Sequence, residues 1–472
     1  MKKLINVIVM KSKNIKLNFI LSSTSLSAGE GKRVRFLLLI PYFLFSACSV
    51  SKQISKQADT ILIQDSAINQ GHIGISIYEP ATGKYWYNYQ AEKYFVPASN
   101  TKLFSLYAGM KYLGDILVWL NILEYNDSIY LQATGDPTLL HPDFKSHPVI
   151  NFLVNSTKTL WGSDSKWKAN AWGNGWAWND YEASYMPERS ALPIYGNVAR
   201  FSGKKKDIKY YPKAAVTLSE FPIYSKDGAT GYIDNINREL KQNVFKVGID
   251  GKTETIIEIP FITSGELSFK LLSDTLKKSI IPPNTVPPIE FEADKLKTYV
   301  IHSQPSDTLF TIMMHRSDNF FAEQTLLMAS NTVLGYMNES ALIDSLLKTD
   351  LKDLQQKPRW VDGSGLSRYN LFTPQSFVYI LNKMKNDFGW ERMQNILPTG
   401  GEGTLSSYYK TEQGFIYAKT GTLSNNCALS GYLTTKKNKL LVFSVLANHY
   451  QTTATPVRRA VEKFLKGLRE RY

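Results

Sequence analysis

Hydrophobic side chains follow two kinds of spacing near the start of the chain. Residues 73–78 alternate apolar side chains with small or polar ones, and a turn at 79–84 separates them from an aromatic run at 85–87. This pattern predicts two adjacent strands. From Leu103 to Leu113 the apolar side chains recur every three or four residues, which predicts a largely buried helix. Ser99 is therefore expected at the start of that helix, directly after the strand pair.

The middle of the chain has a different pattern. Between about residues 121 and 263, short alternating runs are separated by Gly, Pro, Asn and Asp, which predicts a β-rich insertion. Helical or hairpin patterns return after it. The elements expected there are a helix at 271–281, a helix from Thr373-Pro374 to about Lys385, a hairpin of 429–433 with 440–446, and a last helix from Thr455-Pro456.

This order of elements predicts an α+β fold. We expect a body built from residues 58–120 and 264–472, which is interrupted by an inserted β-rich domain region at 121–263. Residues 1–47 are expected to form a signal peptide and residues 48–57 a polar tether.

The N-terminal segment has the composition of an export signal. Lys32, Arg33 and Arg35 precede a short apolar run at 36–45, and small residues follow. The run is too short to span a membrane comfortably as a helix. Small residues directly before Cys48 resemble a bacterial lipobox, which implies lipidation of Cys48 and a periplasmic, lipid-anchored protein of the bacterial cell envelope. The alternative is an uncleaved anchor in which Cys48 is incidental.

Composition and charge exclude several classes of protein. The 472 residues are 43% hydrophobic and 20% charged, which is typical of a globular chain. Two Cys are too few for a disulfide scaffold or a four-cysteine zinc site. Half of the net charge of +14 comes from residues 1–47, so the excess does not indicate nucleic-acid binding. The His and Gly patterns indicate neither a catalytic metal nor a phosphate-binding cofactor site.

Three short motifs combine hydroxyl groups with amines or amides. A Ser hydroxyl needs an adjacent base, and residues i and i+3 share one face of a helix, so Lys102 can reach Ser99. A Lys acts as a base only when its pKa is lowered, which burial and a second cation such as Lys419 would achieve. The motifs are Ser99-x-x-Lys102, Ser317-Asp318-Asn319 and Lys419-Thr420-Gly421-Thr422.

The Ser-x-x-Lys spacing alone carries little information. It recurs at 163/166, 202/205, 345/348 and 407/410, and only its place at the start of an apolar helix distinguishes Ser99. The alternative interpretation is that Ser99 merely caps that helix, with Lys102 in solvent and Lys-Thr-Gly in a turn.

Taken together, the motifs resemble the penicillin-binding protein 4 family, the D-alanyl-D-alanine carboxypeptidase/endopeptidases of peptidase family S13. The resemblance covers nearly all of residues 57–472, and the 214 residues between Lys102 and Ser317 match the long insertion of that family. Further matching stretches are Gly135-Asp136-Pro137-Thr138-Leu139, Trp176-Ala177-Trp178-Asn179-Asp180, Asp362-Gly363-Ser364-Gly365-Leu366-Ser367-Arg368 and Gly403-Thr404-Leu405.

The resemblance implies a penicillin-recognising body that cleaves D-Ala-D-Ala termini or D-Ala cross-links of peptidoglycan through an acyl-enzyme. Ser99 would be the nucleophile and Lys102 the base, while Ser317 would protonate the leaving D-Ala and Asn319 would position the substrate. Expected ligands are stem peptides and β-lactams. The terminal carboxylate would be bound by the segment Lys419, Thr420, Gly421 and Thr422, chiefly by Lys419 and Thr422.

The same resemblance places Asp180 and Arg368 near the side chain of the stem peptide. Asp180 could pair with a free amino group, although an Asp after Trp-x-Trp-Asn is also a common turn residue. We expect Asp136 to be a turn residue and Cys427 to be a small semi-buried side chain rather than a nucleophile. The Trp residues at 161–178 are expected in a domain core rather than stacked on glycan.

Two other functions are compatible with these motifs. A serine β-lactamase or esterase would hydrolyse the acyl-enzyme rapidly, but the long insertion and the lack of a recognisable deacylating Glu motif argue against it. A catalytically silent peptidoglycan-binding lipoprotein would use the same groove without turnover, but all three motifs are intact.

Overall fold

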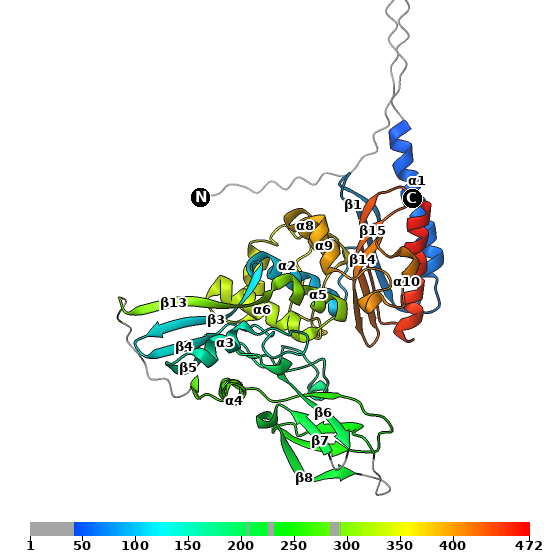
Figure 1. The fold of residues 1–472 in the computed structure, drawn as a ribbon. Coiled ribbons are helices and arrows are strands. Elements are labelled where there is room, and N and C mark those ends of the chain that lie inside the picture. Colours follow the sequence, from blue (N-terminus) through cyan, green and yellow to red (C-terminus); the bar gives the residue numbers. More distant parts are fainter. Residues whose placement is uncertain (1–41, 205–206, 225–230, 284–291, 293) are drawn as a thin grey trace, which may run out of the picture. The chain divides into compact units, whose positions relative to one another are not determined.

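The computed structural model describes residues 42–472 apart from 205–206, 225–230, 284–291 and 293 (Figure 1). The expected signal peptide at 1–47 lies mostly outside these residues. Residues 47–472 form one compact unit, and the body, the insertion and the groove described below belong to it.

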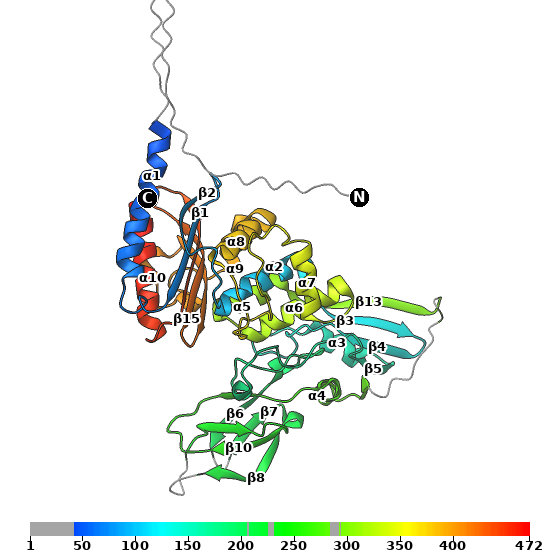
Figure 2. The same ribbon diagram turned by 180° about the vertical axis from the view of Figure 1, so that it is seen from behind.

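The first part of the body is an antiparallel five-stranded sheet. Its strand order is β14-β15-β16-β1-β2, so the predicted N-terminal strand pair and the predicted C-terminal hairpin share one sheet and are confirmed. Helices cover both faces, which explains why β15 and β16 are buried along almost their whole length (Figures 1 and 2). The strands are β1 (His72–Glu79), β2 (Lys84–Tyr89), β14 (Ile416–Leu423), β15 (Asn426–Thr434) and β16 (Leu440–Asn448).

The predicted buried helix is one of the helices that cover one face of this sheet. It is α2 (Lys102–Tyr112), preceded by a 3₁₀ turn at Ala98–Thr101. The helix predicted at Thr373-Pro374 is α8 (Pro374–Phe388), with the Thr373 hydroxyl capping the N–H of Ser376 at 3.1 Å. The other helices of this layer are α5 (Ser306–Arg316), α6 (Asn319–Leu334), α7 (Glu339–Lys348) and α9 (Trp390–Ile396).

The opposite face of the sheet is covered by α10 (Ala454–Arg471) and by α1 (Tyr42–Ala58), which continues into a π-helical turn at Asp59–Ile63 (Figure 2). The predicted polar tether at 48–57 is therefore wrong. Ile54 and Ala58 lie one helical turn apart and are fully buried in a core that includes Phe464 of α10. Among the helices of the described residues, none is both long and apolar enough to cross a membrane.

The inserted region is rich in strands, as predicted. It contains a five-stranded sheet in the order β12-β5-β4-β3-β13 and two three-stranded sheets in the orders β8-β10-β9 and β11-β6-β7. Its elements are β3 (Ile116–Tyr125), β4 (Ser128–Ala133), α3 (Pro148–Asn155), β5 (Thr159–Ser163), β6 (Val198–Lys204), β7 (Asp207–Tyr211), β8 (Thr217–Tyr224), β9 (Asn235–Arg238), β10 (Val244–Gly248), β11 (Ile257–Pro260), α4 (Gly265–Leu276), β12 (Ile280–Ile281) and β13 (Leu296–Pro305).

The boundaries of the insertion differ from the expected 121–263. Because β13 pairs antiparallel with β3, the region extends from about residue 116 to residue 305. The helix expected at 271–281 is α4, which begins earlier because Ser264 caps it by accepting a hydrogen bond from the N–H of Leu267 at 3.0 Å. It ends at Leu276, before β12. The limits of the insertion could not be predicted, because β3 and β13 are far apart in sequence and their pairing leaves no local pattern.

Candidate active site

The three sequence motifs meet along one groove between the sheet and the helices of the body. The first motif comes from the turn before α2, the second from the α5–α6 junction and the third from the edge strand β14. The groove has a volume of about 620 Å³. Its walls include Ser99, Asp180, Tyr185, Ser317, Asn319, Arg368, Thr422 and Ser424.

Lys102 lies at the centre of the first motif. Its Nζ donates hydrogen bonds to Ser99 Oγ at 2.9 Å, to Asn319 Oδ1 at 2.6 Å and to the carbonyl oxygen of Ser364 at 2.7 Å. The side chain is fully buried. Burial lowers its pKa to about 8, although nearby carboxylates, Asp362 foremost, act in the opposite direction. Lys102 is thus placed to act as a base on Ser99 near neutral pH.

Lys419 forms the second amine of the groove. From β14 its Nζ donates to Ser317 Oγ at 2.7 Å and to the carbonyl oxygen of Thr420 at 2.8 Å. Burial lowers the pKa of Lys419 well below its usual value, and the charges of Lys102 and Arg458 lower it further. We expected the charge of Lys419 to lower the pKa of Lys102. Instead, the charge of Lys102 lowers the pKa of Lys419.

The backbone conformation at Ser317 explains how the motif at 317–319 contacts both Lys419 and Lys102. Ser317 ends α5 in the left-handed region at φ 63°, and Asp318 then caps α6 by accepting from the N–H of Phe321 at 2.9 Å. This sharp turn directs Ser317 to Lys419 and Asn319 to Lys102. The Asn319 amide also donates to the carbonyl oxygen of Tyr185 at 2.9 Å.

Two glycines allow the backbone segments of the groove to approach one another. A Cβ on Gly421 would lie 2.7 Å from the carbonyl oxygen of Pro97 and 3.0 Å from the nitrogen of Ser99. Gly365 has φ +82°, and a Cβ there would lie 2.0 Å from the carbonyl oxygen of Ala98. The 3₁₀ turn that contains Ser99, the nucleophile in the prediction above and hence called the nucleophile turn, is therefore held between β14 and the loop at 362–368, with no room for a Cβ at Gly421 or Gly365.

Sequence reasoning assigned no role to most of that loop. The Asp362 carboxylate organises it by accepting from the N–H groups of Gly365 at 2.8 Å and Ser367 at 2.7 Å. Glu323 accepts from the N–H of Ser364 at 2.7 Å, and so fixes the carbonyl group that contacts Lys102. Asp-Gly-Ser-Gly is a composition typical of turns, but a turn signal does not reveal which lysine its carbonyl group contacts.

The two residues assigned to the stem peptide line the same groove. Asp180 ends a 3₁₀ turn at Trp178–Asp180, and Arg368 donates to the carbonyl oxygen of Ser424 at 3.1 Å. Trp178 is 68% exposed, so the expectation that this Trp cluster lies in a core is wrong for Trp178.

A second cavity of about 340 Å³ adjoins the groove at Ser317. It shares Tyr185, Ser317 and Asn319 with the groove but does not include Ser99. Arg200 and Arg316 contribute to its walls. Ser317 therefore borders both cavities, whereas Ser99 borders only the groove.

The other singled-out residues are structural. Asp136 accepts from the N–H of Thr138 at 2.8 Å and from the Ser303 hydroxyl, as a turn residue does, and burial raises its pKa to about 6. Burial also raises the pKa of the Cys427 thiol, which agrees with an unreactive side chain. Within the described ranges, no three His, Cys, Asp or Glu side chains are grouped to hold a metal ion.

The chain matches a known peptidase family over most of its length. The model of the D-Ala-D-Ala carboxypeptidase 3 (S13) family matches residues 54–468. The chain is 25% identical over 460 residues to a D-alanyl-D-alanine carboxypeptidase of Actinomadura sp. (strain R39), covering 85% of this chain and 82% of that one. It is 22% identical over 518 residues to penicillin-sensitive carboxypeptidase A of Dictyostelium discoideum, covering 91% and 97%.

A solved structure confirms the predicted fold class. The crystal structure of penicillin-binding protein 4 from Haemophilus influenzae superposes with a TM-score of 0.69 at 19% identity, covering 88% of this chain and 99% of that chain. The α+β body with its β-rich insertion is thus the penicillin-recognising fold.

Proposed function

From the premise that this chain belongs to the D-Ala-D-Ala carboxypeptidase 3 (S13) family of serine-type DD-peptidases, we propose that it cleaves D-Ala-D-Ala bonds of peptidoglycan stem peptides through an acyl-enzyme on Ser99. One observation carries the assignment of the nucleophile. Lys102 Nζ lies 2.9 Å from Ser99 Oγ in a buried site, and burial lowers the pKa of this amine to about 8.

Acylation begins with neutral Lys102. Its Nζ accepts the proton of Ser99 Oγ while the oxygen attacks the carbonyl carbon of the penultimate D-Ala. The backbone N–H of Ser99, at the start of the helix, faces the developing oxyanion. As the C–N bond breaks, Ser317 gives its proton to the leaving amine and recovers one from protonated Lys419, to which it is hydrogen-bonded.

Deacylation needs neutral Lys102 again. After the leaving group departs, Lys102 loses the proton it took from Ser99 and Lys419 regains one, both by exchange with solvent. A water molecule then loses a proton to Lys102 and attacks the ester carbonyl, and Ser99 leaves with a proton returned by Lys102. The products are the shortened stem peptide and free Ser99.

The substrate carboxylate has its partners at β14. Lys419 and Thr422 bind it, with Thr420 and Gly421 forming the strand between them. The carboxylate supplies the opposite charge that buried Lys419 lacks in the free protein, and so favours the protonated amine that Ser317 needs. Binding of the correct chain end thereby prepares the leaving-group proton.

The stem peptide side chain lies at the other end of the groove in this proposal. Asp180 pairs with a free amino group there, and Arg368 contacts the peptide close to Ser424. Both line the groove that contains Ser99, which supports this assignment.

The second cavity supports cross-links as substrates beside free termini. It adjoins Ser317, the proton donor to the leaving group, and not Ser99. A leaving group larger than one D-Ala therefore has room on that side. A cross-linked muropeptide dimer and a pentapeptide monomer, assayed in parallel, test this: release of D-Ala alone would restrict the enzyme to carboxypeptidase activity.

The nucleophile is tested by intact mass of the detergent-solubilised full chain after incubation with benzylpenicillin. We expect one penicillin adduct on the wild type and none on Ser99→Ala. The matched control is Ser345→Ala, which removes the hydroxyl of another Ser-x-x-Lys pair, on α7, whose Lys348 is exposed. An adduct on Ser99→Ala would disprove the assignment. Penicillin consumed without an adduct would favour the β-lactamase alternative, and no reaction at all the silent wall-binding protein.

We also propose that Cys48 carries a lipid that holds the enzyme on a bacterial membrane in the periplasm. The family's substrate class requires a location in the cell envelope, and the lipobox-like residues before Cys48 support the anchor. Cys48→Ala should move the protein from the membrane fraction to the soluble fraction, while Cys427→Ala should not. Continued membrane association of Cys48→Ala would contradict the lipid anchor.

A further inference from the structure

The hydroxyl group of Thr422 has a charged partner on the side of the sheet that faces away from the catalytic helices. Arg458, in the first turns of α10, donates a hydrogen bond from Nη2 to Thr422 Oγ1. Thr422 itself is exposed and lines the groove that contains Ser99. One side chain thus connects α10 with the wall of the catalytic groove.

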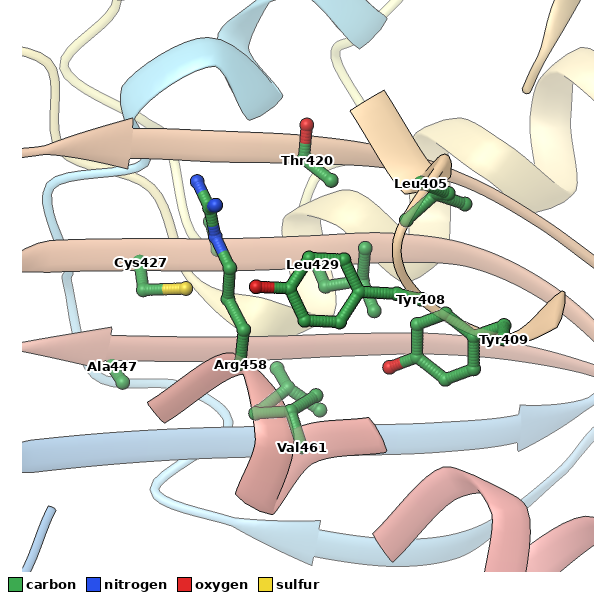
Figure 3. Close-up of a pocket in the computed structure, with 11 residues that line it drawn as sticks. Leu405, Tyr408, Tyr409, Thr420, Cys427, Leu429, Ala447, Arg458 and Val461 are labelled. Carbon is green, nitrogen blue, oxygen red and sulfur yellow. The ribbon is translucent and has the colours of Figure 1, made fainter. Parts of the chain in front are cut away.

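Arg458 reaches this position through a small, mostly apolar pocket. Figure 3 shows its side chain running from α10 across the sheet towards β14 and passing between the side chains of Cys427 and Tyr408. The Tyr408 ring centre lies 6.0 Å from the guanidinium carbon. The half-buried side chain is therefore held by its surroundings rather than free in solvent.

The neighbouring Arg459 has a different environment. It is exposed, donates to Glu462 Oε2 at 2.6 Å and lies 4.3 Å from the centre of the Tyr408 ring. Arg458 and Arg459 carry the same charge on the same helical turn, but only the hydrogen bond of Arg458 ends on a residue of the catalytic groove.

The hydrogen bond to Thr422 determines what its hydroxyl can do. A hydroxyl group has one proton to donate and lone pairs that accept. Because the guanidinium donates to Oγ1, the Thr422 proton stays available for an acceptor in the groove. A guanidinium also keeps its charge at every physiological pH, whereas burial lowers the pKa of Lys419 well below its usual value. Arg458 is therefore the permanent cation behind this part of β14.

We propose that Arg458 is a positioning residue for the terminal carboxylate of the substrate and acts through Thr422. The proposal rests on the function proposed above, in which Lys419 and Thr422 bind that carboxylate. Arg458 orients the Thr422 hydroxyl as a donor and adds positive charge beside it. The carboxylate is thus recognised by β14 together with α10.

The test compares two acylating agents that differ only in this charge: benzylpenicillin and its methyl ester. For Arg458→Gln we expect the ratio of their second-order acylation rate constants to fall about ten-fold, the usual size for one lost charge-assisted hydrogen bond. Arg459→Gln, which removes the same charge one residue away, should keep the wild-type ratio. Arg458→Lys should recover part of it, because the charge is kept without the planar fork.

A double-mutant cycle with Thr422→Val tests the path of the effect. If Arg458 acts through Thr422, the double variant should discriminate no worse than Thr422→Val alone. Additive losses, an unchanged ratio in Arg458→Gln, or an equal loss with both penicillins at an unchanged melting temperature would each overturn the proposal. Failure of the wild type to acylate Ser99 would instead contradict the proposed function, so the two failures are distinguishable.

Discussion

The body and the inserted region both bury ionisable side chains, with opposite consequences. In the body, Lys102 and Lys419 are fully buried and contact Ser99 and Ser317, which line a groove. In the inserted region, Asp136 is as deeply buried, but its carboxylate accepts hydrogen bonds from the N–H of Thr138 and the hydroxyl of Ser303. Burial shifts the pKa of Lys102 and of Asp136 alike.

The difference lies in what each buried group faces. The amine of Lys102 contacts the Ser99 hydroxyl, which can react, whereas the Asp136 carboxylate closes a turn. In the proposed mechanism, desolvation therefore makes Lys102 reactive in the body, whereas in the inserted region it accompanies a local structural constraint. A shifted pKa becomes a catalytic property only where the group meets a substrate.

One added methyl group in each region should affect the body and the inserted region very differently. Gly421→Ala should lower the acylation rate at least about 100-fold, because the new Cβ pushes β14 away from the nucleophile turn. Gly162→Ala on β5 creates a similar clash, 2.7 Å from the Phe269 ring, inside the inserted region. It should cost about 1–3 kcal/mol of stability with acylation changed less than about two-fold.

Both variants are measured by stopped-flow acylation with a fluorescent penicillin and by thermal unfolding. Comparable acylation losses in the two variants would show that the inserted region and the catalytic groove are not separable in this way.

The pH dependence of acylation tests whether Lys102 is the base. The amine must be neutral to accept the Ser99 proton, so the rate should rise with pH through a midpoint near pH 8. Because the proposed mechanism also needs protonated Lys419, whose pKa burial lowers, loss of that proton should reduce the rate again at higher pH. At pH 6 the rate should be roughly 100-fold below that expected for fully neutral Lys102, because about 1% of the amine is neutral there. The second-order rate constant for benzylpenicillin between pH 6 and 9.5 measures this. A rate that stays constant over this range would exclude Lys102 as the base.

The smallest expected effect concerns Asp136. Its pKa is raised from 3.8 to about 6 in the folded protein, so its contribution to stability is complete below pH 4 and is lost as the pH rises to about 6. Asp136→Asn lacks this titration. The melting temperature of the variant minus that of the wild type should therefore increase by about 2 °C between pH 4 and 6. A constant difference would indicate an ordinary pKa for Asp136, and acylation at pH 8 should not change in either case.

Much of the body could be predicted because its signals are local. The strand alternation at 73–78, the Thr373 cap and the apolar face of α10 each lie within a few residues of sequence, and the structure confirms all three. The motif residues could be assigned to one groove because their side-chain chemistry is complementary.

The remaining features depend on partners that are distant in sequence. The limits of the insertion are set by β13 pairing with β3, and the loop around Ser364 gains its meaning only from contact with Lys102. Residues 48–57 of helix α1 were expected to form a tether because apolar side chains are few there. Its burial depends on α10, at the opposite end of the chain.

The docking of α1 also sets how far the enzyme can work from its anchor. With a lipid on Cys48, the chain is already fixed to the body at Ile54, whose side chain is fully buried. The helical stretch between them spans only about 9 Å at 1.5 Å per residue. A lipid-anchored enzyme would then have almost no flexible linker. It would reach only peptidoglycan that lies within its own length of the membrane.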